Sequence, residues 1–290
     1  MSKSVSSTQD EHFDIILQPE NSFFKLNLTE VWRYRDLMWL FVRRDFVAQY
    51  KQTILGPIWH VIQPLLTTIM FLFLFGKIAG ISTDGVEPPL LFYMSGITIW
   101  NYFSACLTST SNTFISNAAI FGKVYFPRLV IPLSVVISNI VRFGIQFGLL
   151  LVFIVIYAFK GYPIHFTIYW LGIPVIVFVM AGIGLGLGII ISSLTTKYRD
   201  LSFLLTFAVQ LGMYVTPVAY PLSYLAKSKY KWLIDLNPLT SITEAFRYCI
   251  FGKGTVETQG LLYSFGFMVV VLVVGSLIFN KVEKSFMDTV

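Results

Sequence analysis

Four polar residues recur at every fourth position of one long apolar run: Ser134, Ser138, Arg142 and Gln146. Residues four apart share one face of an α-helix, so the run predicts a helix with a single polar stripe. Arg142 is the only basic residue in the middle of a predicted membrane span, about 12 residues or roughly 18 Å from the end of its helix. Hydroxyls, an amide and one cation suit the lining of a hydrated path.

Other apolar runs carry similar side chains. His60, Gln63 and Thr67 lie in one run, and Gln210 lies in another with Thr206 and Tyr214 on its face. Hydrogen bonds between helices are one interpretation of such residues, and a polar path through the membrane is the other. For the set as a whole we expect the path, lined by His60, Gln63, Tyr102, Arg142, Gln146, Gln210 and Tyr214.

The groups needed for catalysis or energy conversion are missing from the sequence. All fifteen Asp and Glu lie outside the predicted spans, whereas carriers driven by ion gradients usually need ionisable groups within the membrane. No G-x-x-x-x-G-K-[ST] loop is present to hold nucleotide phosphates. No Ser/His/Asp or paired-carboxylate spacing appears either. We therefore expect a transport subunit that is not an enzyme and has no cofactor or metal site of its own.

Two further motifs favour packing over chemistry. Gly182, Gly184, Gly186 and Gly188 lie within an apolar run without a preceding strand, so they predict close helix packing and not a dinucleotide site. The two cysteines, Cys106 and Cys249, have apolar neighbours and are expected to be buried as small hydrophobic residues.

The composition predicts an all-α polytopic membrane protein. Hydrophobic residues make up 56% of the 290 and charged residues 12%, against about 25% charged in soluble domains. The mean hydropathy is +0.72 and the pI is about 9.2. The net charge of +6 is explained by basic flanks facing anionic lipid, and not by nucleic acid. Several windows of 18 or more residues hold no acidic or basic group, as membrane-spanning helices do. We predict six spans, near 58–80, 91–113, 130–157, 168–193, 201–217 and 260–280.

Basic residues set the expected orientation. They precede the first span and follow the second, fourth and sixth, while the 81–90 connection has none. By the positive-inside rule, both termini are expected to be cytoplasmic. The 218–259 segment contradicts this pattern, because it is basic yet would be external. It is also too apolar for a loop, which predicts broken, re-entrant helical pieces buried in protein.

The amino-terminal part has two regions. Residues 1–28 are polar and are expected to be a cytoplasmic segment without a cleaved signal peptide. Within 29–57, Trp, Phe and Leu alternate with Arg and Lys at helical spacing. Basic residues on one side and large apolar residues on the other predict an amphipathic helix lying in the membrane interface. Gly56-Pro57 then turns the chain into the first span.

Five motifs in order resemble those of ABC-type polysaccharide export permeases. They are Trp32 to Asp36, Arg44-Asp45 with Tyr50 to Trp59, Phe126-Pro127-Arg128, Tyr198-Arg199-Asp200 through Pro217 to Pro221, and Asn237-Pro238-Leu239 with Glu244 and Arg247. The match runs from about residue 30 to the end. The most similar members export lipid-linked O-antigen, and capsule and teichoic acid permeases are nearby.

This resemblance implies a homodimer of six-span subunits in the inner membrane of a bacterium, driven by two copies of a separate ATPase that binds ATP and Mg²⁺. It implies a coupling helix near 114–126 that contacts the ATPase through Asn117, Ala119, Ile120, Phe121, Gly122 and Lys123. Arg43, Arg44 and Lys51 would meet a pyrophosphate headgroup at the cytoplasmic entrance, with anchoring to lipid phosphates as the alternative.

The expected function is therefore the permease subunit of an ATP-driven exporter of undecaprenyl-linked polysaccharide. One alternative is a permease of the same fold that exports teichoic acid, capsule, a smaller lipid or a drug. The other alternative, from a different class, is a channel or scaffold that needs no ATPase.

Overall fold

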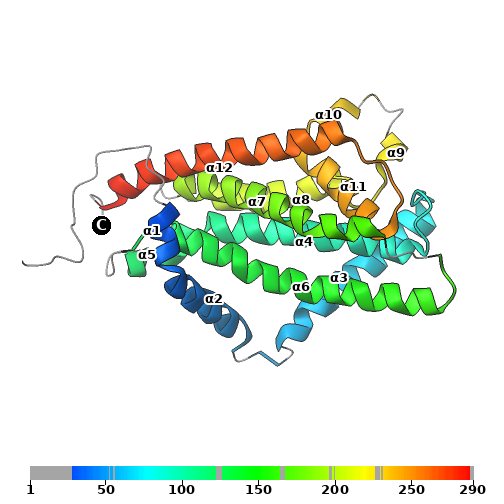
Figure 1. Cartoon of the computed structure of the whole chain (residues 1–290), viewed down its shortest axis with the longest axis horizontal. Helices are drawn as coiled ribbons and strands as arrows, with labels where there is room; N and C mark the ends of the chain where they lie inside the picture. The colour runs from blue at the N-terminus through cyan, green and yellow to red at the C-terminus, as the bar shows by residue number, and fades with distance from the viewer. Residues whose placement is uncertain are drawn as a thin grey trace, which may run out of the picture.

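The computed structural model of the chain describes residues 28–51, 53–54, 56–121, 126–163, 167–195, 198, 200–225, 229 and 231–287, and most of these residues are helical. No strand occurs among these residues. The predicted all-α class is therefore confirmed. Figure 1 shows the long helices running roughly along the longest axis of the molecule.

Five helical segments of the described chain are long and apolar enough to cross a membrane, and they match five of the six predicted spans to within two residues. In chain order they are η1, α3 and η2 (Gly56–Ile58, Trp59–Phe71, Leu72–Ile78), α4 (Pro89–Ser111), α6 (Val130–Phe159), η3 and α7 (Ile168–Gly172, Ile173–Thr195), and the part of α12 (Thr258–Met287) that ends at Lys281.

The sixth predicted span is the shorter helix α8 (Leu201–Val215), with 15 residues. At 1.5 Å per residue it is about 22 Å long, which is shorter than a hydrocarbon core of about 30 Å. Thr216 is extended and Pro217 follows it, so the helix ends where the two prolines predict. The count of six spans stays a prediction, because α8 alone does not reach across.

Helix α7 is packed between α4 and α12 through its glycines. A Cβ on Gly182 would lie 2.5 Å from Met268, and one on Gly186 would lie 2.8 Å from Val271, both on α12. Gly184 and Gly188 face the other way, since their Cβ atoms would lie 2.9 Å from Cys106 and 2.6 Å from Thr110 of α4. Each glycine thus lets a neighbouring helix approach closely, as predicted.

The predicted re-entrant segment consists of three helices, α9 (Leu222–Leu225), α10 (Lys231–Asp235) and α11 (Pro238–Phe251). Asn237 caps α11, since its side chain accepts a hydrogen bond from the backbone N–H of Leu239 at 3.0 Å. Ten of the fourteen residues of α11 are buried. The described chain is thus broken into helices here and α11 is buried in protein, whereas α9 has no buried residue and α10 has only Ile234; re-entry into the membrane stays a prediction.

The amino-terminal helix is divided by a turn at Tyr34 into α1 (Leu28–Arg33) and α2 (Arg35–Tyr50). Phe41 and Val42 are buried, but Trp39, Leu40 and Phe46 are exposed on the same surface as Arg43. The prediction that basic and apolar residues occupy opposite sides is therefore wrong. Phe41 and Val42 pack against the rest of the molecule, and the other large apolar residues share the exposed surface with the basic residues.

Figure 1 shows where the ends of the helices lie. α1, α5 (Thr113–Phe121) and the last turns of α12 are at one end of the molecule, and α9 is at the other. Helix α2 runs obliquely from the α1 end, and α3 returns from it at an angle. As a result α3 begins beside the middle of α6, and not at its end.

Candidate functional site

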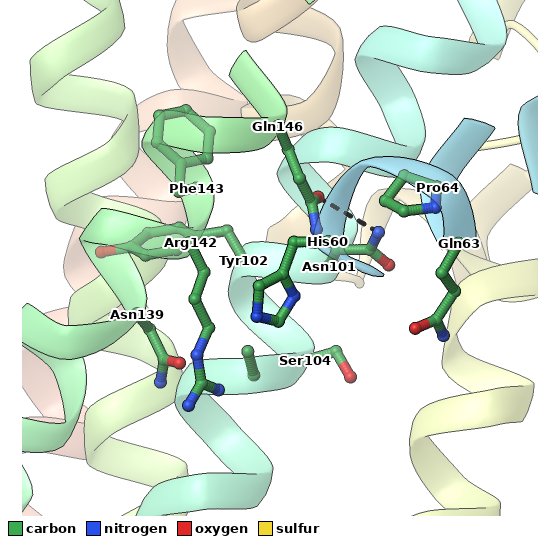
Figure 2. A pocket seen from close by; sticks show the side chains of 11 residues that line it. His60, Gln63, Pro64, Asn101, Tyr102, Ser104, Asn139, Arg142, Phe143 and Gln146 are labelled. Atoms are coloured by element: carbon green, nitrogen blue, oxygen red, sulfur yellow. Dashed lines mark hydrogen bonds between the residues drawn. The ribbon is translucent and has the colours of Figure 1, made fainter. Parts of the chain in front are cut away.

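A polar cavity of about 190 Å³ lies between α3, α4 and α6. It contains five of the seven residues predicted to line a path, namely His60, Gln63, Tyr102, Arg142 and Gln146. The remaining lining residues are Pro64, Asn101, Ser104, Ala105, Asn139 and Phe143. Figure 2 shows the side chains of Arg142 and His60 close to each other on one side of the cavity, while Gln63 points away from them.

Helix α6 supplies the charged group of the cavity and two amides. Asn139, Arg142 and Gln146 lie on one face of this helix, because residues three and four apart are neighbours on a helix surface. The amide of Asn101 on α4 donates a hydrogen bond to Oε1 of Gln146 at 3.2 Å, which fixes the two helices at one end of the cavity (Figure 2).

His60 is held by the end of α2. Its Nε2 lies 3.1 Å from Nε2 of Gln49 in a hydrogen bond, and its ring packs edge-on against the ring of Tyr50, with centroids 5.7 Å apart. Burial raises the pKa of the Tyr50 phenol above its ordinary value, and the positive charge of Arg142 acts in the opposite direction. The approach of α2 along α6 thus brings a residue from the start of α3 to the level of Arg142.

Arg142 has no hydrogen bond and no ion pair with any residue that the structure describes. Asp45 is the carboxylate whose charge acts on it, but Asp45 already binds Arg44, with Oδ1 2.7 Å from Nη2. Near Arg142, both polar atoms of the Asn139 amide and the Tyr102 hydroxyl are buried without a hydrogen-bond partner. Buried polar groups are normally paired, and here three unpaired polar atoms belong to residues that line one cavity with a charged side chain.

Two predicted path residues lie elsewhere. Gln210 and Tyr214 are on α8, and neither lines the cavity. Both are exposed, Tyr214 to 55%. Within one chain, Gln210 and Tyr214 are therefore not brought together with Arg142.

The three residues predicted at the entrance have different environments. Arg43 is exposed and lines a groove of about 310 Å³ between α2 and α6, together with Trp39, Phe46 and Arg142. Arg44 forms an ion pair with Asp45 and donates a hydrogen bond to Asn117, whose Oδ1 lies 3.3 Å from Nη2 of Arg44. Lys51 is exposed just after α2. Arg43 and Lys51 are thus free to meet an anion, whereas Arg44 has internal partners.

The predicted coupling helix begins as α5 (Thr113–Phe121). Asn117 is buried. Its side chain accepts a hydrogen bond from Arg44 and donates one to the carbonyl oxygen of Thr113 at 3.0 Å. A direct contact of Asn117 with a partner is therefore disfavoured, and Ile115 and Ser116 form the exposed face instead. Ile120 is partly buried. Gly122 and Lys123 lie outside the described residues, as do the side chains of Ala119 and Phe121.

Helix α11 contains a buried ion pair between Glu244 and Arg247, although no predicted span contains a carboxylate. Nη1 of Arg247 lies 3.0 Å from Oε1 of Glu244, and Nη2 donates to the carbonyl of Val218 at 2.6 Å. The guanidinium also lies over the ring of Phe92 of α4 at 3.8 Å. Burial raises the pKa of the Glu244 carboxyl above its ordinary value, and Arg247 acts in the opposite direction. The spans hold no carboxylate, but this helix packed between them does.

Asn101 and Asn139 were not among the predicted path residues. Asn139 lies three residues before Arg142, outside the period of four that relates the predicted stripe. Asn101 directly precedes Tyr102, so only a helix that presents two adjacent residues to one cavity would have indicated it.

Comparison with known proteins gives consistent results. The family model described as ABC-2 type transporter matches residues 36–251. One O-antigen export system permease protein RfbA of Klebsiella pneumoniae is 32% identical over 256 residues, which cover 87% of this chain and 94% of the relative. The protein of the same name from Myxococcus xanthus is 26% identical over 262 residues, covering 90% and 98% of the two chains. The similarity thus extends over almost the whole length of both proteins.

Proposed function

Because the chain belongs to the ABC-2 type transporter family, we propose that it is the membrane-spanning permease subunit of an ATP-driven exporter of undecaprenyl-linked polysaccharide of the O-antigen type. The observation that carries this proposal is the alignment with permeases of O-antigen export systems over 94% and 98% of their lengths. A similarity confined to one motif would support only a shared fold. The polar cavity within an apolar bundle agrees with a transport role.

The energy for export comes from a partner in this proposal. Two copies of a separate ATPase bind ATP and Mg²⁺ and act on two copies of the permease. The end of the molecule that carries α1, α5 and the last turns of α12 faces the cytoplasm of a bacterium (Figure 1). Two findings support this arrangement: α5 presents exposed residues at that end, and basic residues flank the helices there.

The homodimer is supported by the exposed surface of α8. Phe203, Leu204 and Phe207 are 81%, 62% and 58% exposed in the single chain, and Gln210 and Tyr214 lie on the same helix. Amide and phenol groups have little use against lipid, since hydrocarbon offers no hydrogen-bond partner. In the proposed dimer, α8 faces the second copy and the path, which is where Gln210 and Tyr214 would act.

Deletion of the gene tests the function directly. We expect a lipid-linked glycan to accumulate on the cytoplasmic side of the inner membrane, and the surface glycan to disappear. Deletion of the partner ATPase gene serves as the matched control and should give the same accumulation. If surface glycan were unchanged, the export proposal would be wrong. Accumulation of a capsule or teichoic acid precursor would keep the mechanism and change the substrate, and loss of drug efflux alone would favour a smaller cargo.

A further inference from the structure

We propose that the polar cavity between α3, α4 and α6 is a binding site for an oxyanion, a phosphate or carboxylate group carried by the transported molecule. Arg142 supplies the charge, and Asn139 and Tyr102 supply hydrogen bonds. This assignment of a substrate group rests on the proposed export function.

The uncompensated charge of Arg142 is the first observation. Arg142 is half-buried; a guanidinium stays protonated in proteins, and a charge partly removed from water is stabilised by a counter-ion or by hydrogen bonds. Among the described residues no Asp or Glu lines the cavity. Asp45 is engaged by two nitrogens of Arg44, at 2.9 and 2.7 Å. The charge therefore lacks an internal counter-ion and is available to an anion from outside.

The unpaired polar atoms beside Arg142 are the second, independent observation. Asn139 is 1% exposed and Tyr102 is 2% exposed, and the amide nitrogen, the amide oxygen and the phenol oxygen all lack partners. Both side chains lie near the thiol of Cys106, which is a weak hydrogen-bonding group, and neither meets it in hydrogen-bond geometry. Both residues line the same cavity as Arg142, so an oxyanion beside the guanidinium would offer acceptors to the amide N–H and the phenol O–H when these side chains turn towards it.

The size and the openings of the cavity limit what it can hold. Its volume of about 190 Å³ lies below the roughly 300–1,000 Å³ of sites that enclose a drug-sized ligand. It fits one charged group or one sugar unit of a longer molecule. Arg142 also lines the groove beside Trp39 and Phe46, so an anion can reach the guanidinium from the exposed side of α2.

Calorimetric titration of the purified full-length permease in detergent tests the site. Geranyl pyrophosphate and glucuronate are the two anionic probes, and geraniol and glucose are their neutral counterparts. We expect one anion to bind at least tenfold more tightly than its neutral counterpart. Preference for the pyrophosphate would identify the lipid carrier as the source of the anion, and preference for glucuronate would identify an acidic sugar.

Variants assign the binding to the cavity. Arg142→Leu removes the charge, and Asn139→Asp places a carboxylate of nearly the same shape beside Arg142. Each should weaken anion binding at least tenfold, which corresponds to about 1.4 kcal/mol. Lys77→Gln removes an exposed charge from the far end of the segment that begins beside His60 and should leave binding unchanged. Asn139→Asp keeps the size and shape of the side chain almost unchanged, so it still tests the site if Arg142→Leu fails to fold.

Two results would overturn the proposal: equal binding of anions and neutral probes, or anion binding that survives in folded Asn139→Asp. Neither result affects the gene-deletion test, which reports export whether or not this cavity binds an anion. Conversely, anion binding in a permease whose deletion leaves surface glycan intact would keep the site and remove the export function.

Discussion

Glu244→Gln is expected to destabilise this protein strongly, although the side chain lies far from the polar cavity. Glu244 and Arg247 are 3% and 1% exposed at their side chains, with a nitrogen–oxygen distance of 3.0 Å. The same guanidinium donates to the carbonyl of Val218, at the break after α8, and lies over Phe92 of α4. Three segments therefore meet at one charged group.

The magnitude follows from the burial of the pair. Removing one partner of a buried ion pair leaves the other charge uncompensated and typically costs about 3–5 kcal/mol. An exposed pair of the same type contributes about 0–1 kcal/mol. Lys231 and Asp235 form such a pair in α10, at 3.9 Å and with side chains 45% and 48% exposed. Asp235→Asn is therefore the matched control, since it makes the same chemical change without the burial.

The assay is thermal unfolding of the purified permease in detergent, followed by the loss of the monodisperse peak on size exclusion. Glu244→Gln should lower the midpoint clearly, and Asp235→Asn should leave it nearly unchanged. The double variant Glu244→Gln with Arg247→Met gives the sharpest test. It removes the stranded charge and leaves only unpaired neutral groups such as the Val218 carbonyl, at about 1–3 kcal/mol, so it should be more stable than Glu244→Gln alone. A double variant that is less stable than the single one would refute the reasoning.

Two further predictions concern packing and coupling. Gly186→Ala should destabilise the protein by about 1–3 kcal/mol, because its Cβ would lie 2.8–2.9 Å from Val271 and Leu272 of α12. Gly144→Ala has nothing within 4 Å of its Cβ and should be neutral or stabilise the protein by up to about 1 kcal/mol. Thermal unfolding compares the two variants, and equal effects would contradict the packing of α7. Ile115 is 48% exposed on α5, and Ile115→Glu should abolish co-purification of the ATPase while the permease stays monodisperse. Ile168 is 77% exposed at the start of η3, and Ile168→Glu should leave co-purification unchanged. If Ile115→Glu retained the ATPase, α5 would not belong to the interface.

The positions of the spans could be predicted from the sequence because long apolar runs have one stable form in lipid. Backbone groups must be satisfied within the helix, so the limits of each run fix the limits of the helix closely. The prolines at 217 and 221 marked the end of α8 for the same reason, since proline removes a donor. The helical period also predicted that Arg142 and Gln146 share a face, which the cavity confirms.

The tertiary arrangement of the polar groups could not be predicted in this way. Whether Asn101 or Gln210 reaches the cavity depends on the rotation of α4 and α8, and the stripes of both helices are equally polar in the sequence. The approach of α2 along α6 depends on packing of residues such as Phe41, whose ring lies 5.8 Å from that of Phe126. Interhelical contacts of this kind are non-local, and periodicity carries no information about them.

The two interior arginines separate structural from functional charge. Arg247 has a carboxylate, a backbone carbonyl and an aromatic face around its guanidinium, and only its Nε lacks a partner. Arg142 has none of these among the described residues, and its neighbours Asn139 and Tyr102 are also without partners. Arg142 is half-buried and a charge partly removed from water is stabilised by an opposite charge, so the missing internal partner favours an anion that arrives from outside the chain. The stability experiment on Glu244 and the binding experiment on Arg142 therefore test the same premise, that an unpaired charge within the protein is unfavourable. If Glu244→Gln left Arg247 unpaired without loss of stability, the reason for expecting an anion beside Arg142 would also be removed.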